Sequence, residues 1–294
     1  MKSGKYKDKL IIRFKGGLGN QMFQYAMYCK QKHLGKQVCA DVSAYTEREG
    51  CMPFVLCDVF PQISLQLVKD EEAAYYLAAQ NKKNILDKVI AAFWWQERDY
   101  TSEKENGVFD KRVFSLKKGF LDGYWQTEKY FSDIREEVLK DFQFKVADSS
   151  LKKYADKIRD NSVSVHVRRG DYLNFSDIYG GICGMDYYKK AMDFFCEKNL
   201  ETVFYVFSDD KEWVQKAFRE YNAVVVEKDF FSDYEDWYDM YLMSQCNHNI
   251  IANSSFSWWG AWLNQNKNKK VISPGKWFNG EKTSDIWCPE WIRM

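Results

Sequence analysis

Short apolar runs alternate with segments of helical periodicity in the first half of the chain. Residues 10–14 form an apolar run that ends at a Gly-Gly-Leu-Gly-Asn turn, and apolar positions then recur at helical spacing. This order predicts a strand, a glycine loop and a helix. We also expect a strand over 37–41 and helices over 70–88 and 130–142. The tract 119–125 and the pair Trp94-Trp95 give no clear period.

The second half alternates more regularly between the two patterns. The expected strands cover 162–167, 202–207, 223–226, 249–252 and 270–272, and the expected helices cover 186–197, 212–221, 234–246 and 256–264. Strands that alternate with helices at this spacing predict a parallel sheet with covering helices. We therefore expect an α/β protein with two domains, 1–150 and 151–294.

The composition excludes several classes of function. The chain has 294 residues, and its 43 lysines and arginines nearly balance 42 aspartates and glutamates. No field of one sign indicates a nucleic-acid partner, so an anion must be bound by a local site. The 8 cysteines are scattered without a Cys-x-x-Cys pair, and there are 3 histidines. This spacing predicts neither a zinc site nor a disulfide framework, and we expect no metal.

The apolar runs are too short for a membrane protein. None reaches spanning length, and the few apolar residues after the basic N-terminus are too few for the core of a signal peptide. We therefore expect a cytoplasmic protein. Peripheral membrane contact and the oligomeric state are left open.

A charged cluster directly follows the expected strand 162–167. Its residues are His166, Val167, Arg168, Arg169, Gly170, Asp171 and Tyr172. Ligands of parallel sheets gather beyond the carboxyl ends of the strands, and the planar guanidinium of arginine binds phosphate oxygens as a fork. The cluster therefore favours an anion site, with a surface group of ion pairs as the alternative.

A glycine loop follows the first strand. Gly17 and Gly19, with Asn20 and Gln21 after them, allow backbone N–H groups to approach an anion or a sugar at the start of a helix. A phosphate-binding loop of the Gly-Lys-Ser type is absent from this segment. A nicotinamide fingerprint fits the two glycines in part, with Asp41 as the ribose carboxylate, but Met22 stands at its third glycine position.

Two further clusters lie at expected strand ends. Asp209 and Asp210 follow the strand 202–207 and are candidates for reading a guanine edge or for capping the next helix. The residues Asn253, Ser254, Ser255 and Phe256 lead from a strand into a helix and offer donors to a phosphate. Arginine, hydroxyl, carboxylate and glycine at strand ends are together what a nucleotide-sugar pocket needs.

These segments carry a resemblance to a known family. Residues 16–26, 166–172, 207–210 and 253–260 resemble the α-1,2-fucosyltransferases of glycosyltransferase family 11, and 274–277 and 289–291 fit as well. The resemblance covers nearly the whole chain. It implies a GT-B-type architecture of two Rossmann-like halves with a cleft between them. It further implies an inverting, metal-free transfer of L-fucose from GDP-β-L-fucose to O2 of a terminal β-galactoside on a glycan, without a cofactor.

The resemblance also implies roles for individual residues. Arg168 would bind the β-phosphate of GDP, Asn20 would face the reacting centre from the acceptor-side domain 1–150, and the donor would bind in 151–294. The expected substrate-binding positions are Gly17, Gly19, Gln21, His166, Arg169, Tyr172, Asp209, Asp210, Asn253, Ser254, Ser255 and Phe256. Asp171 is either the general base or an ion-pair partner of Arg168. The rival functions are a nicotinamide-dependent oxidoreductase and a non-catalytic nucleotide-sugar-binding module.

Overall fold

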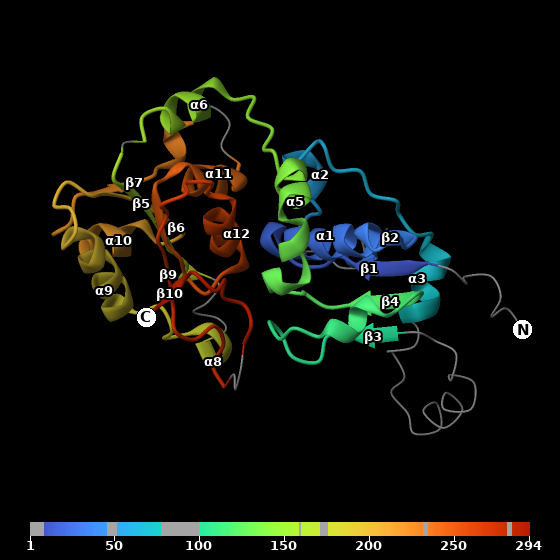
Figure 1. Ribbon diagram of the computed structural model, residues 1–294. Coiled ribbons are helices and arrows are strands. Elements are labelled where there is room, and N and C mark those ends of the chain that lie inside the picture. Colours follow the sequence, from blue (N-terminus) through green and yellow to red (C-terminus); the bar gives the residue numbers. More distant parts are fainter. Residues whose placement is uncertain are drawn as a thin grey trace, which may run out of the picture. The chain divides into compact units, whose positions relative to one another are not determined.

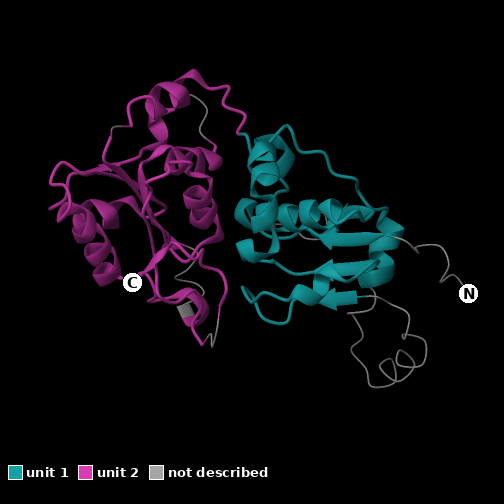
Figure 2. Ribbon diagram, viewed as in Figure 1, with its two compact units in different colours: residues 1–143 teal, residues 144–294 magenta. Residues whose placement is uncertain are grey.

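The chain folds into two compact units. The computed structural model describes residues 9–45, 52–77, 100–158, 160–170, 176–231, 235–280 and 284–294. Unit 1 is Met1–Gln143 and unit 2 is Phe144–Met294, shown in different colours in Figure 2. Each unit has its own parallel sheet with helices (Figure 1). The two α/β halves predicted from the sequence are present, and the units change at 143/144, close to the predicted 150/151.

Unit 1 is built on a four-stranded parallel sheet. Its strands are β1 Leu10–Arg13, β2 Val38–Asp41, β3 Tyr100–Ser102 and β4 Gly119–Asp122, in the order β2-β1-β4-β3. Leu10 is paired with Val38 on one side and with Gly119 on the other. Because every pair is parallel, the residues that follow the four strands share one edge of the sheet. That edge holds the candidate site residues of unit 1.

The long helix of unit 1 follows the glycine loop as predicted. The helices of this unit are α1 Leu18–His33, α2 Leu56–Val59, α3 Asp70–Leu77 and α5 Arg135–Asp141, with 3-10 turns η1 Ser43–Tyr45, η2 Lys111–Phe114, η3 Glu128–Tyr130 and η4 Ser132–Ile134. Most apolar positions of α1 are buried, and Met22, Phe23 and Ala26 have no exposed surface. The amphipathic period of this segment therefore reflects a buried helix face.

One prediction for unit 1 needs correction. The helix expected over 130–142 begins only at Arg135, because two 3-10 turns precede it. The buried Phe131 and Ile134 belong to these turns, and their spacing of three resembles that of an α-helix. The tract 119–125 begins with β4, a strand too short to show alternation. The helix predicted over 70–88 is present as α3, and residues 78–88 and Trp94-Trp95 lie outside the described residues.

Unit 2 is built on a six-stranded parallel sheet in the order β10-β9-β8-β5-β6-β7. Its strands are β5 Ser162–Val167, β6 Val203–Ser208, β7 Ala223–Val225, β8 His248–Ile250, β9 Val271–Ser273 and β10 Ile292–Arg293. The central strand β5 is buried at every position, as its run predicts. β10 was not predicted, because two residues carry no period. The pair β5 and β6 is in register up to Val167 opposite Ser208.

Helices cover both faces of this sheet (Figure 1). They are α6 Ser149–Ala155, α8 Ser176–Tyr179, α9 Met185–Cys196, α10 Lys211–Ala217, α11 Trp237–Gln245 and α12 Ser255–Leu263, with the 3-10 turn η5 Lys228–Phe230. One face packs the valines of β5 against α9 and α10. On the other face, Asn249 of β8 donates to the Met243 carbonyl of α11, and Asn264 after α12 donates to Asn249. The sheet is thus packed against helices on both faces.

Candidate functional site

The sequence cluster after β5 meets the cluster after β6 in unit 2. Because β5 and β6 are parallel neighbours with level ends, Arg168 and Arg169 emerge beside Asp209 and Asp210. Arg168 Nε lies 3.4 Å from Asp209 Oδ2, and Arg169 Nε lies 3.0 Å from Asp210 Oδ2. Each arginine therefore has its own carboxylate from the adjacent strand. The structure thus brings these two motifs together at one edge of the sheet.

Asp209 organises the backbone that carries the arginines. The N–H of Arg169 donates to its Oδ1 at 2.9 Å, and the N–H of Gly170 donates to its Oδ2 at 3.1 Å. A Cβ on Gly170 would lie 3.1 Å from Asp209 Oδ2, so a side chain there would press on this carboxylate. Both carboxylate oxygens are engaged by the loop after β5. A guanine contact by Asp209 stays a prediction, and the structure gives the residue a positioning role.

Asp210 is an N-cap, as the alternative interpretation predicts. Its Oδ1 accepts from the N–H of Trp213 at 3.1 Å in the first turn of α10. The hydrogen bond from Arg169 and that from the Trp213 N–H lower the pKa of its carboxyl. The guanidinium of Arg169 also lies over the Trp213 ring, 4.4 Å from its centroid. Arg169 is therefore held against α10, and its predicted contact with substrate remains untested.

His166 occupies the face of β5 opposite to the valines. It is buried, and its ring lies 5.8 Å from that of Phe256 in α12. Its carbonyl oxygen accepts a hydrogen bond from Tyr188 Oη at 3.0 Å. The structure therefore brings His166 and Phe256 together from segments ninety residues apart.

The segment that leads into α12 divides into a scaffold residue and two hydroxyls. Asn253 is buried; its Nδ2 donates to the Trp277 carbonyl at 3.1 Å, and its Oδ1 accepts from Cys183 Sγ. These contacts tie three loops together, and a substrate contact by Asn253 stays a prediction. Ser254 is the N-cap residue of α12, yet its side chain makes no capping hydrogen bond. Ser254 and Ser255 therefore stand where backbone and hydroxyl donors can meet an anion.

The glycine loop of unit 1 holds Asn20 and a buried glutamine. Gly16 adopts a left-handed φ of 80°, and its carbonyl accepts from Tyr45 Oη and from Gln21 Nε2. The Gln21 side chain is fully buried, and its Oε1 accepts from the N–H groups of Val55 and Leu56. The amide of Gln21 joins the loop to the start of α2, and its substrate contact stays a prediction. Gly17 and Gly19 begin α1 without a side-chain cap.

The residues required by the nicotinamide interpretation are otherwise engaged. Asp41 is 1% exposed, its Oδ1 accepts from the N–H of Ser43, and Arg13 Nε lies 4.0 Å from its Oδ2. A carboxylate that binds a ribose must be reachable by its two hydroxyls. Met22, in place of the third glycine, is buried in the core. These placements argue against a dinucleotide site at this loop.

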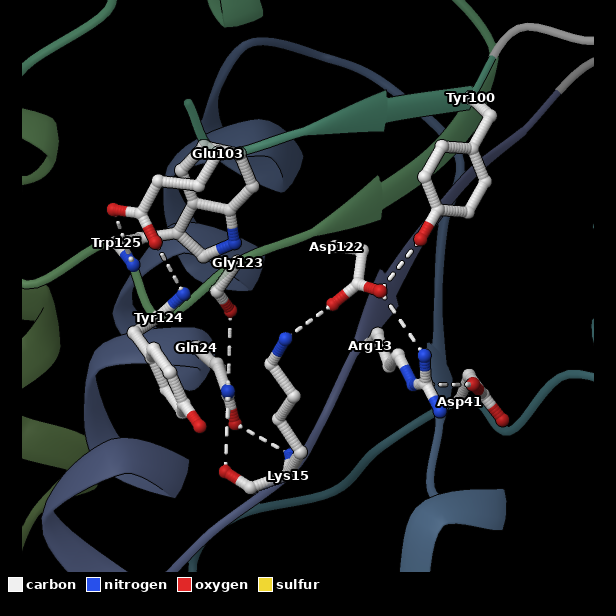
Figure 3. Close-up of polar contacts among 10 residues, drawn as sticks. All are labelled: Arg13, Lys15, Gln24, Asp41, Tyr100, Glu103, Asp122, Gly123, Tyr124 and Trp125. Carbon is white, nitrogen blue, oxygen red and sulfur yellow. Dashed lines mark hydrogen bonds and ion pairs between the residues drawn. The ribbon is translucent and has the colours of Figure 1, made fainter. Parts of the chain in front are cut away.

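A charged group at the same edge of unit 1 was missed at the level of sequence (Figure 3). The Asp122 carboxylate accepts from Lys15 Nζ at 2.6 Å, from Arg13 Nη1 at 3.0 Å and from Tyr100 Oη at 2.5 Å. Burial opposes its charge, but the hydrogen bonds from Lys15 and Tyr100 prevail and lower its pKa. Lys15 also lies over the Tyr124 ring, 4.8 Å from its centroid. The signal was present, since Arg13 and Asp122 end their strands and Lys15 follows β1 by two residues.

Several expectations fall outside what can be placed. Asp171 and Tyr172 lie outside the described residues, so their roles stay predictions. Among the described residues, no group of three or more histidines, cysteines, aspartates or glutamates could hold a metal ion. In the same part of the chain, no helix is both long and apolar enough to cross a bilayer.

The chain is similar to known glycosyltransferases. The family model described as glycosyl transferase family 11 matches residues 68–294. An Escherichia coli α-1,2-colitosyltransferase is 33% identical over 97% of this chain and 98% of its own length. The galactoside α-(1,2)-fucosyltransferase 1 of Lagothrix lagotricha is 31% identical over 155 residues, 49% of this chain and 42% of that protein.

The solved structures agree in fold. An Arabidopsis thaliana FUT1 variant in complex with GDP superposes with a TM-score of 0.51 at 11% identity, over 92% of this chain and 71% of that chain. The two Rossmann-like α/β halves are those of the GT-B fold, as the sequence predicts. On the family match over most of its length and the relative that it covers almost completely, the chain belongs to glycosyl transferase family 11.

Proposed function

We propose that this protein transfers L-fucose from GDP-β-L-fucose to O2 of a terminal β-galactoside, with inversion at the anomeric carbon. The family membership supports a glycosyltransferase, and two relatives are named for α-1,2 transfer. The observation that carries the proposal is the segment 168–170 directly after β5, which we call the arginine loop. Two of its backbone N–H groups and one ion pair anchor it on Asp209. Such a loop presents a fixed guanidinium where a diphosphate would bind.

The chemistry of the transfer explains why the guanidinium must be fixed. As the sugar leaves, negative charge builds on the β-phosphate while the sugar becomes oxocarbenium-like. Preorganised donors aimed at that charge lower the barrier without reorganisation during the reaction. Arg168 would supply its planar fork, and the first N–H groups of α12 with Ser254 and Ser255 would supply further donors. These residues would stabilise the charge that other transferases neutralise with a divalent ion.

The general base belongs to the same proposal. An inverting transfer needs a group that accepts the proton of the attacking hydroxyl. Asp209 already pairs with Nε of Arg168, so Asp171 is not required for that task, and we assign the base role to Asp171. Asp171→Asn should then reduce transfer by about 10²–10⁴-fold, the usual effect of general base catalysis. GDP affinity should be unchanged in calorimetric titration; a parallel loss of GDP affinity would return Asp171 to a binding role.

The donor sugar is tested by competition. Colitose, which the colitosyltransferase relative is named for, is the 3-deoxy form of L-fucose, and that relative covers nearly the whole chain. GDP-fucose and GDP-colitose should therefore be compared with the same lactoside acceptor. We expect the larger kcat/KM for GDP-fucose; a preference for GDP-colitose would replace the donor but leave the reaction class intact. Hydrolysis or transfer of either sugar excludes the non-catalytic binding module, and thermal protection by GDP but not by NAD excludes the oxidoreductase.

A further inference from the structure

A strained turn follows β4 in unit 1. Trp125 is buried with a φ of 57°, in the left-handed region that a residue with a large side chain seldom adopts. Its indole Nε1 is buried and has no hydrogen-bond partner among the described residues. Such strain persists only where the surrounding structure over-determines it, and it gathers at functional positions. The turn is therefore held in place at a cost in stability.

Several side chains hold this turn (Figure 3). Glu103 accepts from the N–H of Tyr124 at 2.6 Å and from the N–H of Trp125 at 3.2 Å. Gln24 donates to the carbonyl of Gly123 at 3.2 Å. A Cβ on Gly123 would lie 2.7 Å from Glu103 Cβ and 2.8 Å from the Trp125 ring, so a glycine is needed there. Glu103 and Gln24 thus hold the backbone that leads into residue 126.

That next residue is Gln126. It is buried, and its Nε2 donates to Asn20 Oδ1 at 2.7 Å. This bond determines which way the Asn20 amide is turned, because a donor on Gln126 requires the oxygen of Asn20 to face it. Asn20 is partly exposed, and its Nδ2 lies over Gly16, where a Cβ would come within 2.5 Å. The structure gives Asn20 Nδ2 no acceptor among the described residues.

We propose that Gln126 is a positioning residue for the transfer reaction, which holds Asn20 so that Nδ2 is offered as a donor to a substrate oxygen. The ligand group would be a hydroxyl or ring oxygen of a sugar, or a phosphate oxygen. The inference rests on the proposed function, because Asn20 reaches the substrate only if the chain is a sugar transferase. In this proposal the strained turn at Trp125 has a function, which is to place Gln126 beside Asn20.

The test is designed to reverse the Asn20 amide by changing a single heavy atom of residue 126. Gln126→Glu keeps the shape of the side chain but replaces the donor with an acceptor, so the Asn20 amide should rotate and offer its oxygen instead. We expect kcat to fall by about 10²-fold, the loss that a small misplacement of a reacting group can cause. KM for the donor should change little, whereas the melting temperature should fall, because the new carboxylate is buried. Gln37→Glu, the same change at an exposed position of unit 1, is the control and should retain full activity.

A double-mutant cycle separates positioning from plain stabilisation. If Gln126 acts through Asn20, Gln126→Glu should cost nothing more in an Asn20→Ala background. An equal loss in both backgrounds, or an unchanged kcat in the single variant, would overturn the inference. Should Gln126→Glu not fold, Gln126→Met removes the donor at similar length and enters the same cycle. If the wild-type protein transfers no sugar, the proposed function fails first, and the inference fails with it.

Discussion

Asp209→Asn isolates the contact that orders the arginine loop. The asparagine keeps the size of the side chain and one acceptor oxygen. Its amide nitrogen, however, would face the N–H of either Arg169 or Gly170, both of which now donate to the carboxylate. Two donors cannot bond to each other, so one of the two anchors is lost. The ion pair with Arg168 is lost with it.

The size of the effect follows from these contacts. A hydrogen bond to a charged group contributes about 1.5–3 kcal/mol. Because the Asp209 side chain is 25% exposed, we take about 2 kcal/mol for the lost anchor, near the lower part of that range. If the binding geometry of the loop becomes about 2 kcal/mol less favourable, the apparent affinity for GDP falls by about 30-fold. Asp210→Asn is the matched control, since asparagine caps a helix as well as aspartate, and it should cost less than about 5-fold.

The assay is calorimetric titration with GDP and with inosine diphosphate, which lacks the 2-amino group of guanine. If Asp209 supports the loop, Asp209→Asn should weaken both nucleotides by the same factor and leave their ratio unchanged. If Asp209 instead reads the guanine edge, the variant should lose its preference for GDP. A collapse of the GDP to inosine diphosphate ratio would refute the positioning role. Unchanged affinity for both would refute the importance of the loop.

Three further predictions concern the phosphate site, the metal and the charged group of unit 1. Arg168→Lys should reduce transfer by about 10²–10³-fold, because a point charge cannot replace the fork; near wild-type initial rates would remove Arg168 from the site. Transfer should continue in excess EDTA, and a loss restored by Mg²⁺ or Mn²⁺ would contradict the proposed role of the guanidinium. Asp122→Asn should lower the free energy of unfolding by about 3 kcal/mol, since Arg13 and Lys15 lose a largely buried partner. Because the pKa of Asp122 is lowered in the folded state, its charge stabilises the fold above the ordinary pKa range of aspartate, and this stability is lost as pH falls. The difference in free energy of unfolding between wild type and variant, measured with urea, should therefore close below about pH 4. A difference that does not depend on pH would contradict this.

The sequence predicts the features that repeat along the chain. The strand β5, buried at every position, could be identified because its three valines alternate with side chains that tolerate burial. The glycine loop before α1 could be identified because glycine marks a sharp change of direction. The candidate residues at strand ends followed from the parallel order. These are local properties, or consequences of one general rule about parallel sheets.

The remaining features depend on contacts between distant segments. The side chain of Gln21, a predicted substrate contact, accepts hydrogen bonds from the N–H groups of Val55 and Leu56, more than thirty residues away. Asp209 reaches the backbone of Arg169 across forty positions. Neither periodicity nor propensity predicts such a bond, because the same polar residue type can bind substrate or support the fold. The left-handed Trp125 could not be foreseen either, since its conformation is imposed by Glu103 and Gly123.

The most direct test of the proposed function is the structure of the product. The protein should be incubated with GDP-β-L-fucose and a terminal β-galactoside, and the isolated product examined by NMR for its linkage and anomeric configuration. We expect one new α-linked fucose on O2 of the galactose. A β-linked product would contradict inversion, and attachment to another hydroxyl would contradict the proposed acceptor position. No transfer from either GDP sugar to any galactoside would contradict the central claim.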